Sequence, residues 1–386
     1  MQKFQRMSTL LLFFGLWLFC SQRVIAENAK ILVPAPPKIA ASSYILMDYH
    51  SGRILAESNS DQSLPPASLT KIMTVYVVFN TIKDGHLKLT DKVSISKKAW
   101  KTPGSRMFIE VNKQISVEEL LKGVIIQSGN DASVALAEHI AGDEATFAVL
   151  MNEHAQRLGM MSTHFENSMG LPRANHRTTA RDLAILTRAL ISEFPEHYHW
   201  HSQKEFTYNK ITQHNRNKLL WRDATVDGVK TGHTDEAGYC LVASAKREGM
   251  RLISVVMGTD SENARADSNQ SLLNFGFHFY QTHLLYKGQT TLKTSRVWKG
   301  DHNQLNLGLA DDLYITISRE HYKDLKATID IEGAITAPVE KGDSFGKLNV
   351  SLASQAVVSK PLIALESVGI GSVFQRIFDE ALLLVE

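Results

Sequence analysis

The sequence predicts an α+β protein in which an antiparallel sheet flanked by helices is followed by a small all-β domain and a C-terminal amphipathic helix. Strand-like segments at 43–48 and 53–57 flank a turn, and strand patterns return after Asp227, at 239–245 and 251–257. Helical patterns occupy the residues between them. Strands at both ends of a helical stretch favour one antiparallel sheet covered by helices.

The helical middle has recognisable ends. Ser116 and Glu119 have the spacing of a capping box, directly before an apolar run at 120–125. Gly142 and Gly159 end the next two helical patterns. Three residues of an earlier helical segment have the spacing expected of core packing: Met73, Val77 and Val78.

From 283 to 370 the pattern changes to short β-type runs, such as 313–317 and 327–331, which alternate with turns. This range is predicted to be a β-rich C-terminal domain. The last residues, 371–386, return to helical spacing. Their apolar side chains form one stripe: Val373, Phe374, Ile377, Phe378, Ala381, Leu382 and Val385.

The N-terminus has the features of an export signal. Lys3 and Arg6 supply positive charge, and the apolar run 10–19 is short for a membrane span. Small or modest residues at 24–26 suit cleavage, so 1–26 is predicted to be a signal peptide and 27–282 the catalytic domain. An uncleaved N-terminal anchor is the alternative.

Composition limits the range of functions. The chain has 386 residues, 44% of them hydrophobic, which is enough to form an ordinary core and favours more than one domain. Lys and Arg total 42 against 40 for Asp and Glu, so the charge gives no reason to expect a nucleic-acid partner. Cys20 lies in the segment that would be removed, which leaves Cys240 as a single, buried free thiol.

The first motif with chemical content pairs a serine with a lysine. Ser68 and Lys71 are three residues apart, so on a helix they share one face, and Pro65 and Pro66 suit a helix start just before them. A serine hydroxyl needs a base within hydrogen-bond reach to act as a nucleophile. Lys71 can be that base only when neutral, which requires burial or a neighbouring positive charge such as Lys230.

Two further motifs follow in order. Ser128-Gly129-Asn130 lies between two helical patterns, where a tight loop can direct a hydroxyl and an amide into a cleft. Lys230-Thr231-Gly232 lies in a strand pattern, with the first and third side chains on one face. A glycine there allows a substrate backbone to approach and pair with the strand. Each motif alone is also compatible with an ordinary helix turn, surface loop or edge strand.

Together the three motifs and their spacing resemble the penicillin-binding proteins, most closely the low-molecular-mass serine D-alanyl-D-alanine carboxypeptidases. The segments 44–52, 66–71, 127–131 and 227–235 share this resemblance, which extends over essentially the whole mature chain. The resemblance implies a serine β-lactamase/transpeptidase-like fold for the catalytic domain. It also implies peptidoglycan stem peptides as substrates and β-lactam antibiotics as inhibitors.

The resemblance implies catalytic roles for three side chains. Ser68 would attack the carbonyl of the penultimate D-alanine to form an acyl-enzyme, and Lys71 would accept its proton. Ser128, together with Lys230, would pass a proton to the departing D-alanine, and water would then release the acyl group. The oxyanion hole would consist of the backbone N–H groups of Ser68 and His233.

The resemblance also implies a substrate-binding set, in which Thr231 and Arg265 would hold the terminal carboxylate of the peptide. A surface arginine is the alternative for Arg265. The expected substrate-binding residues are Asn130, Lys230, Thr231, Gly232, His233 and Arg265.

Three other classes of protein are alternatives. A β-lactamase shares the fold and the first motif but keeps a carboxylate in an E-x-x-L-N loop, and Glu166 stands in F-E-N-S-M instead. A non-catalytic wall-binding scaffold would lack the serine or a lysine, and all are present. An endopeptidase uses the same constellation, and the additional β-rich domain favours the carboxypeptidase.

No metal or cofactor is expected, because the histidines at 139, 154, 164 and 176 do not have the spacing of metal ligands.

The apolar stripe of 371–386 predicts an amphipathic membrane-anchor helix that lies in the interface, since it is too short and too charged to span a bilayer. Packing against the β-rich domain or a second copy is the alternative. The expected location is the periplasmic side of the inner membrane, with peripheral attachment.

Overall fold

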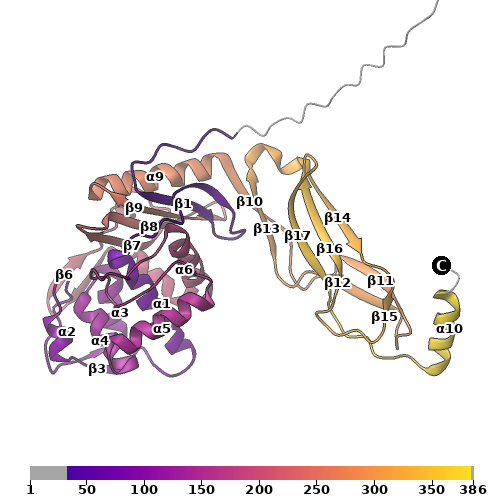
Figure 1. Ribbon diagram of the computed structural model, residues 1–386, viewed down its shortest axis with the longest axis horizontal. Helices are drawn as coiled ribbons and strands as arrows, with labels where there is room; N and C mark the ends of the chain where they lie inside the picture. The colour runs from indigo at the N-terminus through magenta and orange to yellow at the C-terminus, as the bar shows by residue number, and fades with distance from the viewer. Residues whose placement is uncertain (1–32, 384–386) are drawn as a thin grey trace, which may run out of the picture. The chain divides into compact units, whose positions relative to one another are not determined.

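The computed structural model describes residues 33–383. The predicted signal peptide at 1–26 and the stripe residue Val385 lie outside this range. Two parts with separate cores follow one another along the chain (Figure 1). The first ends with helix α9, and the second begins immediately after it, with strand β10 at Tyr280.

The first part is built on a five-stranded antiparallel sheet in the order β2-β1-β9-β8-β7. The hairpin predicted near the N-terminus forms the β1–β2 edge, and the strand with the K-T-G motif forms the opposite edge. The prediction of an antiparallel sheet flanked by helices is therefore confirmed. The strands are β1 Ser43–Asp48, β2 Ile54–Ser58, β7 Val226–Thr234, β8 Gly238–Arg247 and β9 Met250–Thr259.

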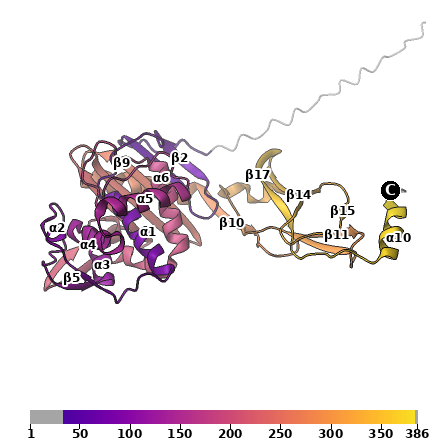
Figure 2. The same cartoon turned by 60° about the horizontal axis from the view of Figure 1, so that its bottom comes forward.

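Helices cover both faces of this sheet, because alternate strand residues point to opposite sides. Val242 and Val255 belong to the core shared with α1, α3, α4, α5 and α6, whereas Leu241 and Val256 pack on the side of α9. Figure 2 shows the group that includes α1 and α4 gathered in one layer. The helices are α1 Thr70–Lys83, α2 Lys97–Lys101, α3 Val117–Ile126, α4 Asn130–Ala141, α5 Glu144–Arg157, α6 Ala180–Glu193, α7 Pro195–Tyr198, α8 Leu219–Arg222 and α9 Glu262–Phe279.

The predicted capping box is confirmed at the start of α3. Ser116 Oγ accepts from the Glu119 backbone N–H, and the Glu119 carboxylate accepts from the Ser116 N–H. Met73, Val77 and Val78 are buried, as their spacing predicted. Short elements complete this part: 3-10 helices η1 Ala67–Leu69 and η2 His199–Ser202, and two antiparallel strand pairs, β3 Lys92–Ser94 with β4 Gln114–Ser116 and β5 Glu205–Tyr208 with β6 Ile211–His214.

The second part is β-rich. A six-stranded sheet runs in the order β14-β16-β17-β12-β11-β15, and β10 pairs with β13. The pair β11–β15 is parallel, and the other ladders are antiparallel. Its elements are β10 Tyr280–Tyr286, β11 Lys293–Trp298, β12 Gln304–Gly308, β13 Leu313–Ser318, η3 Arg319–Asp324, β14 Leu325–Ile331, β15 Ile335–Thr336, β16 Ser344–Leu352 and β17 Gln355–Ala364.

A last helix, α10 Val373–Leu383, follows the β-rich sheet. Its polar side faces that sheet: Asp379 is buried, accepts from the Lys299 backbone N–H at 2.6 Å and lies 3.4 Å from Arg296 Nη2. Lys299 also pairs with Glu380. The charge of Asp379 is therefore neutralised against the β-rich sheet.

Candidate active site

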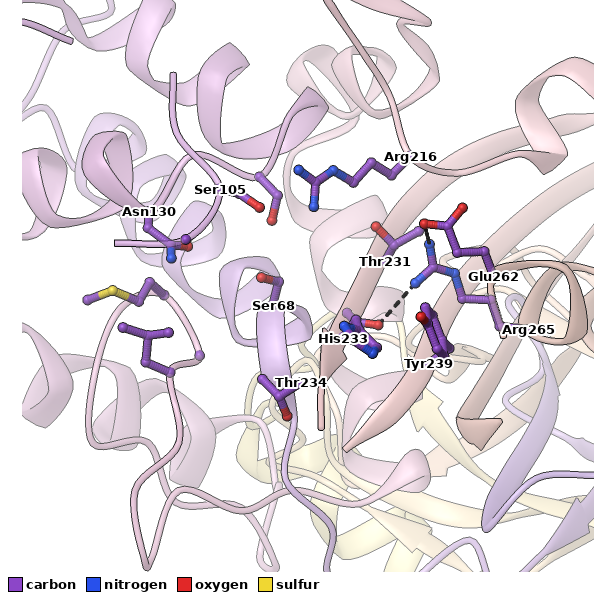
Figure 3. A pocket seen from close by; sticks show the side chains of 16 residues that line it. Ser68, Ser105, Asn130, Arg216, Thr231, His233, Thr234, Tyr239, Glu262 and Arg265 are labelled. Carbon is purple, nitrogen blue, oxygen red and sulfur yellow. Dashed lines mark hydrogen bonds and ion pairs between the residues drawn. The ribbon is translucent and has the colours of Figure 1, made fainter. Parts of the chain in front are cut away.

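A cavity of about 430 Å³ lies between η1, the start of α4 and strand β7. Ser68 stands at its centre, with Asn130 on one side and Thr231 and His233 on the other (Figure 3). The three motifs, distant in sequence, therefore meet at one place. They do so because η1 and α1 pack against the edge strand that carries the K-T-G motif.

The turn that carries Ser68 is held in place by contacts of Ala67, the residue before it. Ser68 lies in the 3-10 turn η1, and α1 begins two residues later at Thr70. Ala67 has a positive φ of 47°. Its carbonyl accepts from Thr70 Oγ1 at 2.8 Å, and Gly170 packs so closely on it that a Cβ there would lie 1.8 Å from the Ala67 oxygen.

The amine of Lys71 is completely buried and has three uncharged acceptors. Nζ lies 3.0 Å from Ser68 Oγ, 2.7 Å from Asn130 Oδ1 and 2.6 Å from the Met169 carbonyl oxygen. Burial, and then the charge of Arg216, lower the pKa of Lys71 to about 7, while Asp131 acts in the opposite direction. The neutral amine is therefore well populated at neutral pH, as a base for Ser68 requires.

The second motif connects α3 to α4, as predicted. Ser128 has a positive φ of 67°, and its buried Oγ has no hydrogen-bond partner within residues 33–383. Asn130 bridges the site, because Oδ1 accepts from Lys71 and Nδ2 donates to the Pro103 carbonyl at 2.6 Å. Asp131 fixes this loop by accepting from the backbone N–H groups of 107–109.

The third motif places a second buried amine beside the first. Lys230 Nζ donates to the Thr231 carbonyl at 3.0 Å. Burial lowers the pKa of Lys230 well below its usual value, and the charges of Lys71, Arg216 and Arg265 lower it further. Lys71 thus weakens the hold of Lys230 on a proton, whereas burial and Arg216 are the main causes that lower the pKa of Lys71.

A close contact explains why a glycine stands at position 232, and the sequence alone does not reveal this contact. A Cβ at this position would lie 3.1 Å from the Pro66 carbonyl oxygen and 3.3 Å from the Ala67 Cβ. Its missing side chain therefore allows β7 to close on the turn that carries Ser68. This close packing acts in addition to any room that the glycine leaves for substrate.

Arg265 is buried in the wall of the cavity, with 3% of its surface exposed, so the alternative of a surface arginine is wrong. Its Nη1 donates to the Gly232 carbonyl at 3.1 Å, and Glu262 lies 4.0 Å from Nη2 (Figure 3). The ring of Tyr239 lies beneath the guanidinium and against His233. Thr231 opens onto the same cavity, so hydrogen-bond donors for a carboxylate are available there.

Sequence reasoning missed Arg216 and the loop at 166–171. Arg216 lines the cavity and bears on the pKa of both buried amines, but it stands in an irregular segment with no motif around it. Met169 contributes only its carbonyl, which no side-chain pattern can reveal. The turn-forming residues of this loop indicate that the chain turns here. They do not indicate that the Met169 carbonyl contacts Lys71.

Cys240 is a buried free thiol, as predicted, and burial raises its pKa to about 11. Among residues 33–383, no three His, Cys, Asp or Glu side chains are grouped in a way that could hold a metal ion. The carboxylate of Glu166 accepts from the Asn175 backbone N–H.

A serine at the start of a helix, a buried lysine in contact with it, and a second serine and lysine across the cleft define the class of serine acyl-transfer enzymes with a lysine base. Comparison with known proteins agrees. The sequence profile described as D-alanyl-D-alanine carboxypeptidase matches residues 30–261, and that of the penicillin-binding protein 5 C-terminal domain matches residues 279–369.

The chain is 46% identical over 372 residues to the D-alanyl-D-alanine carboxypeptidase DacC of Escherichia coli (strain K12), with 94% of this chain and 92% of that protein covered. The crystal structure of penicillin-binding protein 5 from Haemophilus influenzae superposes with a TM-score of 0.84 at 43% identity, over 87% of this chain and 99% of that chain. Penicillin-binding protein D2 of Listeria monocytogenes, solved in an ampicillin-bound form, is 30% identical, with a TM-score of 0.59, over 63% of this chain and 100% of that chain.

This chain belongs to the D-alanyl-D-alanine carboxypeptidase family of penicillin-binding proteins. The resemblance inferred from the three motifs is therefore confirmed, and so are the fold class and the assignment as a hydrolase that acts by an acyl-enzyme. The β-lactamase and scaffold alternatives have no support in these relatives.

The contact between Gly170 and Ala67 is open to a direct test. We expect Gly170→Ala to destabilise the fold by about 1–3 kcal/mol, because the new Cβ meets a carbonyl and φ is +90°. It should also slow acylation, because the carbonyl that the new Cβ meets belongs to Ala67, the residue directly before Ser68. Gly159→Ala is the matched control: φ is +79°, but nothing lies within 4 Å. Denaturant unfolding of both variants measures the difference, and equal losses would show that the contact is unimportant.

Proposed function

We propose that Ser68 is the nucleophile of this carboxypeptidase, with Lys71 as its base. The observation that carries the proposal is the 3.0 Å contact between Ser68 Oγ and a buried amine whose three oxygen partners are all uncharged. A carboxylate partner would keep the amine protonated, whereas neutral oxygens leave burial to lower its pKa. Lys71 is then able to take the hydroxyl proton as Ser68 attacks.

In this mechanism Ser68 Oγ forms a bond to the carbonyl carbon of the penultimate D-alanine, and its proton passes to Lys71. The C–N bond to the terminal D-alanine then breaks, and the leaving amine receives a proton through Ser128. The Ser128 hydroxyl suits this task because no protein group within residues 33–383 occupies it. Water hydrolyses the ester on Ser68 and restores the enzyme.

We further propose that the cavity recognises the carboxylate end of a peptidoglycan stem peptide. Thr231, Arg216 and Arg265 line it, and Glu262 is the acidic residue in its wall. Asn130 can hold the substrate amide, and His233 with Ser68 can offer backbone N–H groups to the oxyanion. A β-lactam presents a carboxylate and an acylating carbonyl to the same groups, consistent with the ampicillin-bound Listeria relative.

Labelling tests the nucleophile. Incubation with a labelled penicillin should add one adduct to the protein, located on Ser68 by peptide mass measurement. Ser68→Ala should abolish it, because no other hydroxyl in the cavity touches the amine of Lys71. Ser105→Ala, which alters another cavity serine, should keep the adduct. An adduct retained in Ser68→Ala would refute the assignment.

The pKa of Lys71 predicts how acylation depends on pH. Below about pH 7 the amine is mostly protonated and cannot accept a proton, so the rate constant should fall by about tenfold for each pH unit. Above this value the neutral form dominates and the rate should level off. Stopped-flow acylation by a chromogenic cephalosporin between pH 5 and 9 measures the profile. A flat profile across pH 7 would contradict a lysine base.

We also propose that the mature protein is exported and attached to the outer face of the inner membrane by α10. None of the helices described here is both long and apolar enough to cross a membrane. The support for interfacial attachment is the exposed stripe of α10, in which Phe374 is 87% exposed and Val373, Ile377 and Phe378 are each 64% exposed. The opposite side of α10 is occupied by the Asp379 contacts with the β-rich sheet.

Flotation with liposomes tests the attachment. We expect the mature protein to float and the protein without 371–386 to remain soluble, because burial of each large apolar side chain contributes roughly 1.5–3 kcal/mol. The double substitution Phe374→Ser, Phe378→Ser should release the protein while keeping the Asp379 contacts. Arg376→Gln on the same helix should float normally. Equal soluble fractions for all four proteins would exclude the anchor.

A further inference from the structure

A buried histidine next to the site is not used in the mechanism above. His176 is 2% exposed, and its ring lies between the loop 166–171 and the first turn of α1. Nδ1 lies 2.8 Å from the Glu166 backbone nitrogen, and Nε2 lies 2.7 Å from Thr70 Oγ1. Both ring nitrogens therefore have partners.

These partners fix the tautomer of the ring. The Glu166 N–H can only donate, so Nδ1 must accept and carries no hydrogen. A neutral ring then has its hydrogen on Nε2 and donates to Thr70 Oγ1. The Thr70 hydroxyl hydrogen is directed to the Ala67 carbonyl at 2.8 Å. The result is one directed chain of hydrogen bonds from the loop, through the ring, to the residue before Ser68.

The loop at the other end of this chain holds the amine of Lys71. Asn167 Oδ1 accepts from the backbone N–H groups of 169–171, so the loop behaves as one compact turn. The Met169 carbonyl in this turn is an acceptor for Lys71 Nζ at 2.6 Å. The same turn brings Gly170 against the Ala67 carbonyl.

We propose that His176 is a positioning residue for acylation, which ties the loop that holds Lys71 to the turn that carries Ser68. This inference rests on the proposed roles of Ser68 and Lys71. Without the ring, the Glu166 N–H and the Thr70 hydroxyl lose their shared partner, and the Met169 carbonyl is free to withdraw from the amine. Water would then reach Lys71 and favour its protonated form.

Burial of the ring agrees with the neutral tautomer, since burial, and then the charges of His164 and Lys71, lower the pKa of His176 to about 4. The ring is therefore neutral throughout the range in which Lys71 titrates. The other charged groups that bear on the Lys71 amine are Arg216 and Asp131, and Lys71 in turn lowers the pKa of Lys230. None of these is altered by a substitution at His176.

Two substitutions separate the contact of His176 with Glu166 from its contact with Thr70. In His176→Asn the amide oxygen can replace Nδ1 and accept from Glu166, but the side chain is too short to reach Thr70. In His176→Gln the longer amide can still donate to Thr70. We expect His176→Asn to lower the acylation rate constant about tenfold, because small misplacements of reacting groups have effects of this size or larger. His176→Gln should recover part of the loss.

The pH profile of acylation distinguishes positioning from mere support of the fold. In His176→Asn the rise near pH 7 should move to higher pH, because Lys71 becomes hydrated, while the penicillin adduct still forms on Ser68. Thr70→Val, which removes the hydroxyl but keeps the shape, should move the profile in the same direction. The double variant His176→Asn, Thr70→Val should be no slower than the slower single variant, since both break one chain.

An unmoved pH profile with an unchanged acylation constant in His176→Asn would overturn the proposal, even if thermal stability falls. If that variant does not fold, Thr70→Val decides the matter in the same assay. If the wild-type protein forms no adduct on Ser68, the proposed nucleophile is refuted instead. Failure of the His176 proposal and failure of the proposed nucleophile are therefore distinguishable.

Discussion

The burial of one lysine amine is the constraint on which the site depends. Lys71 has no solvent around it, so each of its three acceptors must come from the fold: a hydroxyl, a side-chain amide and a backbone carbonyl. An unpaired buried amine would be costly. The helix, the α3–α4 loop and the loop 166–171 therefore have to meet at one point. The same arrangement lowers the pKa of the amine to about 7 and places it 3.0 Å from the Ser68 hydroxyl.

The cavity also concentrates positive charge. Arg216 and Arg265 line it, and Glu262 is the acidic residue in its wall. The charges of Arg216 and Arg265, with that of Lys71, also lower the pKa of the buried Lys230 amine. Such a site weakens the hold of its amines on protons and favours an anionic ligand, because a bound carboxylate offsets the repulsion. Substrate binding and the protonation of the two lysines are therefore linked. The carboxylate of a peptide would raise the proton affinity of Lys230 at the stage when a leaving amine must be protonated.

Several residues matter because they allow or fix the packing between elements that are distant in the sequence. Gly232 allows β7 to approach the turn of Ser68, and Gly170 allows the loop 166–171 to approach it from the other side. Asp379 turns one side of α10 toward the β-rich sheet and leaves the apolar side exposed. In each case the residue shapes the surroundings of a functional group through packing.

Local patterns in the sequence were enough to predict the antiparallel sheet, the capping box at Ser116, the buried thiol of Cys240 and the family, because these depend on short-range spacing and on motifs with a fixed chemical purpose. They were not enough to find Arg216, the Met169 carbonyl or His176. An isolated arginine, a backbone oxygen and a histidine without metal-ligand spacing have no signal of their own, and only the folded chain brings them to Lys71. The sequence by itself determined the fold class, the family and the three motifs. The tertiary structure decided that these motifs meet in one cavity and which neighbours surround Lys71, since burial and hydrogen bonding between distant segments exist only after folding.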